Sequence, residues 1–271
     1  MKKRILLPGA LFSAALVFAL PVVIIICASF MGAGELAAVF RAGAPLRLIP
    51  YEVTPEGYFG LLFKSQTYMA TFWNSMLIAL AVTLGNTLVS LTAAFVLIKA
   101  RLSILKPLLF LYIVAALMPF QVTLLPNYIL IRQLGLYNTW GALILPGVFA
   151  PFGVFLLHQF LKGMPEEWVE AALMETSSLT RVLIGIAAPA MKPGLIAVMV
   201  LSFSEAWNMV EQPLVLLKDD WRYPLSLALN SLKDGGLHIL FPGAVLFMAP
   251  TVLLYFLFED ELVTGLHAMR L

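Results

Sequence analysis

Charged residues are scarce in this sequence of 271 residues. They make up 12% of it, about half of the roughly 25% found in soluble domains. Apolar residues make up 61%, and a water-soluble domain of this length has too little interior to bury that share. An ordinary cytosolic enzyme, a disordered chain and a disulfide-stapled secreted domain are therefore disfavoured. The composition indicates a protein whose solvent is lipid.

Side chains that hold metals or build reaction centres are also few. Cys27 is the sole cysteine, so an intrachain disulfide and a cysteine-based metal site are excluded. His158, His238 and His267 lack zinc-ligand spacing, and the sequence contains neither a glycine-rich phosphate loop nor a nucleophile elbow. We therefore expect no catalytic residue, no metal site and no cofactor in this chain.

The positive charges are scattered along the chain. The net charge is only +2, whereas nucleic-acid binding needs a concentrated basic face. The sequence therefore predicts membrane lipid, and no nucleic acid, as a partner.

Long apolar runs are what the sequence does contain. A helix needs about 20 residues to cross a bilayer, so six helices need about 120 residues. The first run is too long for the apolar region of a signal peptide, which has about 7–15 residues, so we expect it to remain as a span. We predict an all-α polytopic membrane protein, one transmembrane domain over 1–271, with six transmembrane helices at about 6–31, 69–98, 107–126, 139–161, 194–217 and 241–258.

Two of the connecting loops are long. The loop at 32–68 is rich in glycine and proline, and a short amphipathic helix is expected in it near 58–63. The loop at 162–193 is the most polar stretch of the chain.

The basic residues also predict the orientation, because cytoplasmic loops retain lysine and arginine. With the N-terminus inside, ten of the 17 basic residues fall in cytoplasmic segments. The short loop after the second span carries three of them, Lys99, Arg101 and Lys106. We therefore predict both termini in the cytoplasm, loop 32–68 outside and loop 162–193 inside.

Loop 162–193 begins like a helix. Pro165 is followed by Glu166, Glu167 and Glu170, and both residue types are favoured at a helix N-terminus. Ser177, Ser178 and Thr180 can then cap a second helix through 181–186. The small residues of the first helix allow close approach to a groove on another protein. A surface helix resting on lipid headgroups fits the same pattern.

The same loop resembles a known family. The run EAALMETSS at 170–178, followed by IAAPAMKP at 186–193, is similar to the EAA loop of bacterial ABC-importer inner-membrane permeases. Residues 74–146, the run AWNMVEQPLVLL at 206–217 and the ending GLHAMRL resemble the second-subunit (MalG-like) permeases of the maltose-permease type. The resemblance extends from about Glu56 to the C-terminus.

The resemblance implies a division of labour. ATP and magnesium would bind to two separate cytoplasmic ATPase subunits, a second (MalF-like) permease subunit would complete the path, and an extracytoplasmic binding protein would deliver the substrate. The chain would lie in the bacterial inner membrane. The EAA coupling helix would sit in a cleft of an ATPase subunit, with contacts at Glu170, Ala171, Ala172, Leu173, Met174, Glu175 and Thr176.

The chain departs from the family pattern at the bend of this loop. Thr176 stands where the family has glycine, and a β-branched residue tolerates a positive φ poorly. We therefore expect a right-handed or extended turn, with Thr176 or Ser177 capping the second helix.

Polar side chains at membrane depth are costly, so they face a partner, a cavity or water. We hypothesise that Gln121, Glu205 and Asn208 line a translocation path and match sugar hydroxyls, while Trp207 offers a stacking face for a sugar ring. The alternative is that such residues hold helices together. For Asn74 and Asn86 we prefer this alternative.

Taken together, the sequence predicts the permease subunit of an ABC importer for a sugar, oligosaccharide or related polyol, working by alternating access. Two other functions stay open at this point. One is an ion-coupled secondary transporter that uses Glu205, and the other is a membrane scaffold without transport.

Overall fold

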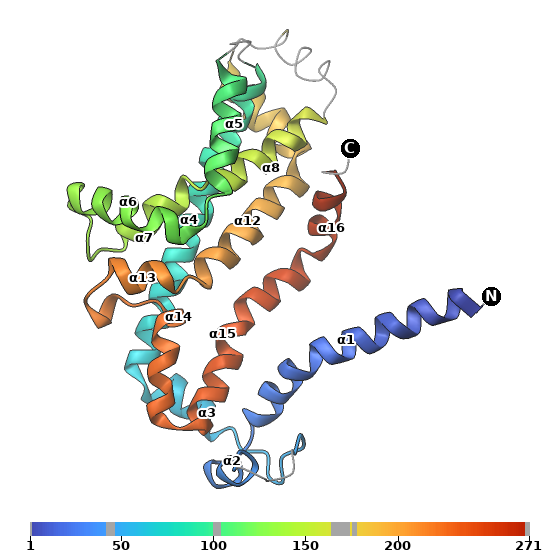
Figure 1. Cartoon of the computed structure of the whole chain (residues 1–271), viewed down its shortest axis with the longest axis vertical. Coiled ribbons are helices and arrows are strands. Elements are labelled where there is room, and N and C mark those ends of the chain that lie inside the picture. The colour runs from blue at the N-terminus through green and yellow to red at the C-terminus, as the bar shows by residue number, and fades with distance from the viewer. Residues whose placement is uncertain (1, 42–46, 100–103, 164–173, 175–177, 269–271) are drawn as a thin grey trace. The chain divides into compact units, whose positions relative to one another are not determined.

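The computed structural model describes residues 2–41, 47–99, 104–163, 174 and 178–268, and these form helices and loops without a strand. The predicted all-α class is confirmed for this part of the chain. The chain divides into two compact units, one of residues 1–72 and 228–250, the other of residues 73–227 and 251–271. Figure 1 traces the helices along the chain.

The first unit contains the N-terminal helices and a 3₁₀ helix from residues 229–235. They are α1 (Lys2–Ala28), α2 (Ala33–Val39), α3 (Glu56–Phe59), the π-helical turn η1 (Gly60–Lys64) and η4 (Leu229–Gly235). The short helix expected near 58–63 is therefore confirmed. A small core of Ala28, Met31 and Leu36 packs against Phe241. The hydroxyls of Ser29 and Tyr58 lie 2.6 Å apart and join the end of α1 to α3.

The second unit contains most of the apolar helices. In chain order they are α4 (Gln66–Lys99), α5 (Leu105–Ala116), α6 (Phe120–Gln133), α7 (Gly141–Val148), α8 (Pro151–Lys162), α10 (Leu179–Val182), η2 (Leu183–Ala187), α11 (Ala188–Ala190), α12 (Lys192–Trp207), α13 (Glu211–Leu216), η3 (Asp220–Arg222), α14 (Leu225–Ala228), α15 (Leu237–Leu257) and α16 (Glu259–Ala268). The first residues of α4 and most of α15 belong to the first unit.

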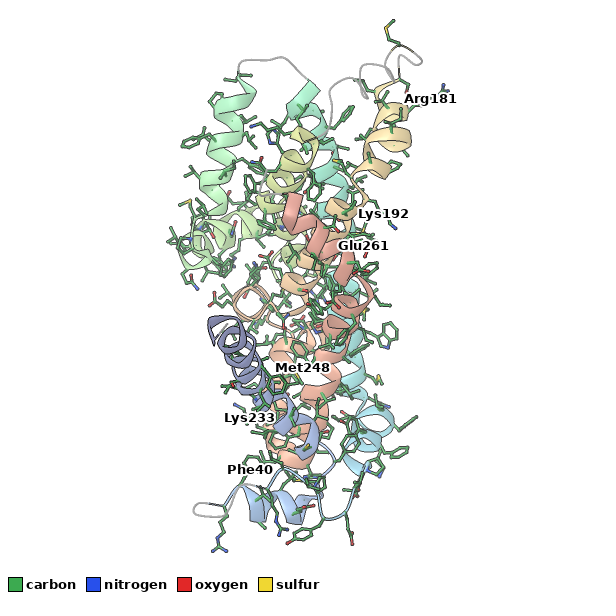
Figure 2. All side chains as sticks on the ribbon, turned by 90° about the vertical axis from the view of Figure 1, so that its right-hand side faces the viewer. Phe40, Arg181, Lys192, Lys233, Met248 and Glu261 are labelled. Atoms are coloured by element: carbon green, nitrogen blue, oxygen red, sulfur yellow. The ribbon has the colours of Figure 1, made fainter. Side chains whose placement is uncertain are left out.

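The core of the second unit is apolar and joins α4, α8, α10 to α12 and α16. Its buried residues are Ala94, Phe95, Leu156, Leu157, Leu161, Val182, Ala187, Met191, Ala197 and Val198. Helices α12 and α16 lie side by side (Figure 1). Lys192 at the start of α12 and Glu261 in α16 form an ion pair of 3.9 Å. Figure 2 labels both residues.

Three described segments are long and apolar enough to cross a membrane, namely Gln66–Ile98, Gly141–Lys162 and Leu237–Leu257. The number rises to five if each of two bent helix pairs counts as one span. A shorter apolar helix, Phe12–Ala28, lies within the first predicted span. The count of six stays a prediction.

Several predicted spans are broken helices. The stretch predicted as one span at 107–126 consists of α5 and α6, because the chain turns at Pro119, which has an extended ψ of 138°. The stretch at 194–217 consists of α12, which ends at Trp207, and the separate helix α13. Sequence hydropathy predicted apolar segments correctly but not where proline and short polar runs interrupt them.

The helix predicted after the coupling loop is present. It runs from Leu179 to Ala190 and meets α12 at 83°. Its N-cap is Ser178, whose side chain accepts a bond from the backbone N–H of Arg181 at 3.4 Å. The expectation of a cap at Thr176 or Ser177 is therefore corrected. Those two residues and the Thr176 turn lie outside the described residues.

Candidate functional site

A polar cavity of about 250 Å³ lies within the second unit. It forms where helices are interrupted, between α5 and α6, between α7 and α8, and at the end of α12. Five polar side chains line it, Thr123, Asn127, Ser202, Glu205 and Gln212. The rest of the lining is Val82, Ala115, Met118, Phe120, Pro146, Gly147, Ala150, Pro151, Ala206 and Met209.

The interruption between α7 and α8 comes from the local sequence. Pro151 begins α8 and has no N–H to offer the carbonyl of Gly147, four residues earlier. The carbonyl of Gly147 instead accepts a bond from the backbone N–H of Ala150 at 3.2 Å. Further donors at this break are stabilising, since an unpaired carbonyl in a lipid environment is costly. Non-helical backbone at membrane depth is tolerated where it is buried in protein or lines a cavity.

Asn86 of α4 supplies those donors. Its side-chain nitrogen donates to the carbonyls of Gly147, Val148 and Ala150 at 3.3, 3.1 and 3.0 Å. Its oxygen accepts a bond from the Ser202 hydroxyl at 3.0 Å. The residue is 1% exposed, so the preferred interpretation of Asn86 as a side chain that holds helices together is confirmed.

Asn74 has the same kind of role nearer the start of α4. Its side-chain nitrogen donates to the carbonyls of Trp221 and Tyr223 at 2.8 and 3.0 Å. It ties α4 to the loop around η3, so the preferred interpretation of this residue is also confirmed.

Glu205 is the one predicted path residue that lines the cavity. It stands on a face of α12 with Ser202 and Ala206, at the i, i+3 and i+4 spacing of one helical stripe. Its side chain is exposed. Within the described part of the chain, no hydrogen bond or ion pair engages its carboxylate.

The other three predicted path residues lie elsewhere in this structure. The Gln121 amide donates to both carboxylate oxygens of Glu211 at 3.1 Å. Asn208 is exposed and donates to the carbonyl of Ser204 at 2.8 Å. None of the three belongs to the cavity lining.

The position of Trp207 differs most from the hypothesis that its ring offers a stacking face for a sugar. Its side chain is 0% exposed, and its ring stacks on Phe203 at 5.6 Å between centroids. In this structure the indole offers no face to the cavity, because the helical turn after Glu205 directs it into the protein interior.

Four polar lining residues were not predicted from the sequence, namely Thr123, Asn127, Ser202 and Gln212. Ser202 could have been found by extending the stripe of Glu205 back by one turn. Asn127 follows Pro126 inside an apolar run, which is the same signal that drew attention to Gln121. Only the contacts distinguish Asn127, which lines the cavity, from Gln121, which binds Glu211.

A hydrogen-bonded bracket joins two loops of this unit. Asn138 has a positive φ of 59°, and its side-chain oxygen accepts bonds from the backbone N–H groups of Lys218 and Asp219 at 2.9 and 3.1 Å. Its side-chain nitrogen donates to the Asp219 carboxylate at 2.8 Å. Trp140 adds a bond to the carbonyl of Arg222. The bracket holds the chain before α7 against the chain that follows α13.

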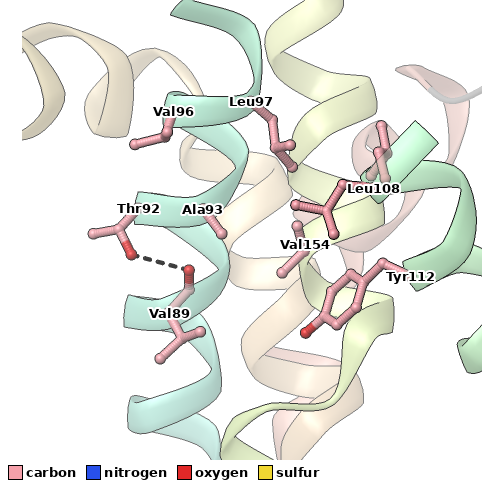
Figure 3. A pocket seen from close by; sticks show the side chains of 9 residues that line it. Val89, Thr92, Ala93, Val96, Leu97, Leu108, Tyr112 and Val154 are labelled. Atoms are coloured by element: carbon pink, nitrogen blue, oxygen red, sulfur yellow. Dashed lines mark hydrogen bonds between the residues drawn. The ribbon is translucent and has the colours of Figure 1, made fainter. Parts of the chain in front are cut away.

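A larger cavity of about 550 Å³ is of another kind. It lies between α4, α5 and α8, and its lining includes Val89, Val96, Leu97, Leu108 and Val154 (Figure 3). Its two hydroxyls are already engaged, since Thr92 donates to the carbonyl of Val89 at 3.0 Å and Tyr112 to that of Phe149 at 2.9 Å. A hydrocarbon-lined space with satisfied hydroxyls has little to offer a sugar.

The coupling residues predicted at Glu170, Ala171, Ala172, Leu173, Glu175 and Thr176 lie outside the described residues. Met174 is described, and its side chain is 89% exposed.

An apolar helical chain with a polar cavity at its broken helices has the architecture of a membrane-transport protein. Residues 86–263 match the family described as "Binding-protein-dependent transport system inner membrane component". The chain belongs to this family. It is a permease component without enzymatic activity, because the ATPase of such systems is a separate subunit.

Curated relatives cover nearly the whole chain. The arabinooligosaccharides transport system permease protein AraQ of Halalkalibacterium halodurans is 28% identical over 93% of this chain and 90% of its own length. The sn-glycerol-3-phosphate transport system permease protein UgpE of Brucella abortus is 25% identical over 82% of this chain and 83% of its own length.

A solved structure has the same fold. It is a bacterial ABC transporter involved in the import of the acidic polysaccharide alginate, with a TM-score of 0.79 and 18% identity over 94% of this chain and 95% of the other. Membership of the family implies a partner permease, an ATPase and a substrate-binding protein, in the inner membrane.

Proposed function

We propose that this chain forms half of the path by which an ATP-driven ABC importer takes up a sugar, oligosaccharide or related polyol. The observation that carries the proposal is the polar cavity around Glu205, Ser202 and Asn127 in a chain that is otherwise apolar. Hydroxyl, amide and carboxylate groups match the hydroxyls of such a cargo. The relatives named for arabinooligosaccharides and for sn-glycerol 3-phosphate support the same class of cargo.

The size of the cavity supports a shared path. Its volume of about 250 Å³ has room for roughly eight water molecules, the scale of one sugar ring. Complete ligand pockets have about 300–1,000 Å³. A second permease subunit of the MalF-like type would supply the other wall.

Transport follows an alternating-access cycle in this proposal. Closure of two ATPase subunits on ATP favours the outward-facing state, and hydrolysis restores the inward-facing state, because the partners bind the two states with different affinity. The coupling helix in loop 162–193 transmits the movement, with Glu170 paired to a basic side chain of an ATPase subunit and Ala171 and Ala172 in close contact. A charged pair of this kind adds specificity more than net affinity.

The topology that goes with this cycle has six spans and both termini in the cytoplasm. Loop 162–193 then faces the ATPase subunits. The loops bracketed by Asn138 and Asp219 face the external binding protein.

Reconstitution tests the function. The complete complex in liposomes, with its binding protein outside and ATP inside, is expected to accumulate a neutral oligosaccharide. The chain alone is expected to transport nothing. Uptake by the chain alone, driven by an ion gradient, would instead establish the secondary transporter that uses Glu205. A complex that hydrolyses ATP without moving any sugar or polyol contradicts the proposal.

Family membership favours the importer over both alternatives. A secondary transporter would couple uptake to an ion and would not use the separate ATPase that membership of this family implies. A scaffold without transport has no need of a polar cavity at broken helices.

A further inference from the structure

The polar cavity around Glu205 carries negative charge only. Glu205 is the one charged residue among the fifteen that line it, and all fifteen are described. Neither lysine nor arginine lines it. The cavity therefore combines neutral hydrogen-bonding groups with a single carboxylate.

Among the residues that the structure describes, no basic side chain forms an ion pair with this carboxylate. The basic residue of α6, Arg132, lies over the rings of Tyr128 and Tyr137, at 5.6 and 5.3 Å from their centroids. The next acid along the chain, Glu211, is bound by the uncharged Gln121 amide. Arg222 faces Asp219 at 3.6 Å.

The consequence is electrostatic. A carboxylate accepts hydrogen bonds from sugar hydroxyls, and these charge-assisted bonds are stronger than neutral ones. A second negative charge about 6 Å away is repelled by the carboxylate. At the effective dielectric constants of about 20–40 that apply near protein surfaces, the repulsion corresponds to about a 10- to 100-fold penalty.

We infer that Glu205 is a specificity-determining residue that admits neutral sugars and rejects anionic cargo such as uronates and sugar or polyol phosphates. The inference rests on the proposed function and narrows it. The proposed function covers both neutral oligosaccharides and polyol phosphates, whereas a cavity with one negative charge favours the neutral cargo.

The test compares two probes that differ in charge alone. One is a neutral trisaccharide, and the other is the same trisaccharide with one primary alcohol oxidised to a carboxylate. Each is supplied at a concentration that saturates the binding protein, so that the initial uptake rate of the reconstituted complex reports the later steps. The wild-type complex is expected to take up the neutral probe at least about tenfold faster.

Three variants locate the discrimination. Glu205→Gln keeps a hydrogen-bonding side chain without the charge, and should bring the two rates at least about tenfold closer together. Glu205→Asp keeps the charge and should keep the preference. Glu211→Gln is the matched control, since it removes a carboxylate of the same chain that lies outside the lining, and it should leave the ratio of rates unchanged.

The outcomes separate the inference from the proposed function. Uptake of neither probe by the wild-type complex contradicts the function. Uptake of both at equal rates by the wild type, or a ratio that Glu205→Gln leaves unchanged, overturns the inference alone. Equal changes in Glu205→Gln and Glu211→Gln also overturn it, because the effect would then come from the net charge of the region.

Discussion

The hydroxyl of Ser202 donates to the side-chain oxygen of Asn86 at 3.0 Å, and this bond joins α12 to α4. The side-chain nitrogen of Asn86 in turn donates to carbonyls at the break between α7 and α8. Ser202 also lines the polar cavity. The buried side-chain amide of Asn86 therefore connects α4 to α12 and to the break between α7 and α8, and all of these elements contribute to the cavity wall.

Replacing Asn86 by leucine should destabilise the protein by about 1–3 kcal/mol, because the carbonyls at the helix break lose the bonds that its amide donates. Ser202→Ala removes a single bond of the same network and should cost less, about 0.6 kcal/mol on average for hydrogen bonds inside membrane proteins. Thermal unfolding of the purified complex measures both. Equal melting temperatures for the two variants would contradict the central position of Asn86.

Gly153→Ala should disturb the same network by steric overlap. A Cβ at this position would stand 2.5 Å from the side-chain oxygen of Asn86 and would also overlap the hydroxyl of Ser90, which is fully buried. Overpacking of this kind costs about 1–3 kcal/mol. The matched control is Gly34→Ala in α2, where a Cβ meets nothing within 4 Å. Its melting temperature should be unchanged or slightly raised, and a similar loss in both variants would refute the prediction.

Asn138 allows a test of backbone strain. Both Asn138→Gly and Asn138→Ala lose the bonds to Lys218, Asp219 and the Asp219 carboxylate. Alanine must also adopt the positive φ of 59°, which costs an L-residue about 1–2 kcal/mol. The alanine variant should therefore be the less stable of the two by about 1 kcal/mol or more, as measured by denaturation of the purified complex. The reverse order would mean that the loop changes its conformation.

Glu170→Lys should separate the chain from its ATPase. Reversing a charge that pairs with a basic side chain in a tight contact costs about 2 kcal/mol or more, so the amount of ATPase that co-purifies with the complex should fall at least about tenfold. Glu52→Lys, in the loop predicted to lie outside, makes the same change of charge and serves as the control. Normal co-purification of the ATPase with Glu170→Lys would remove this residue from the coupling contact.

Ser178→Ala should weaken the helix that follows the coupling loop. Loss of an N-cap costs about 1 kcal/mol, and the helix Leu179–Ala190 leads directly into α12, which carries Glu205. ATP-dependent uptake should therefore fall while the co-purification of the ATPase stays normal. Ser178→Asp restores a cap acceptor and should restore uptake, whereas failure of this rescue would point to another role of the serine.

The helical class and the family were predictable from sequence because both depend on local features. The 61% apolar content requires helices that satisfy their own backbone in lipid. The run from Glu170 to Ser178 identified the family without any knowledge of its geometry. Asn74 and Asn86 were also interpreted correctly, since an amide inside an apolar run has few other uses.

The lining of the cavity was predicted only in part. Glu205, Trp207 and Asn208 are close in sequence, and all three interrupt or end an apolar run, yet Glu205 lines the cavity, Trp207 is buried and Asn208 caps its own helix. Their directions depend on the exact end of α12 and on the packing around Phe203. Gln121 and Asn127 likewise lie on one helix, and only the contact with Glu211 distinguishes them.

The sequence by itself determined that this chain is embedded in a membrane, that it lacks a phosphate loop, and that its polar groups at membrane depth are few. These are properties of composition and of short motifs, and they hold for any arrangement of the helices. The tertiary structure decided which of those polar groups share a cavity, because the breaks at Pro119, at Pro151 and after Trp207 bring α6, the start of α8 and the end of α12 together. A side chain's depth can be estimated from hydropathy, but the direction it faces depends on backbone interruptions and on neighbours distant in sequence.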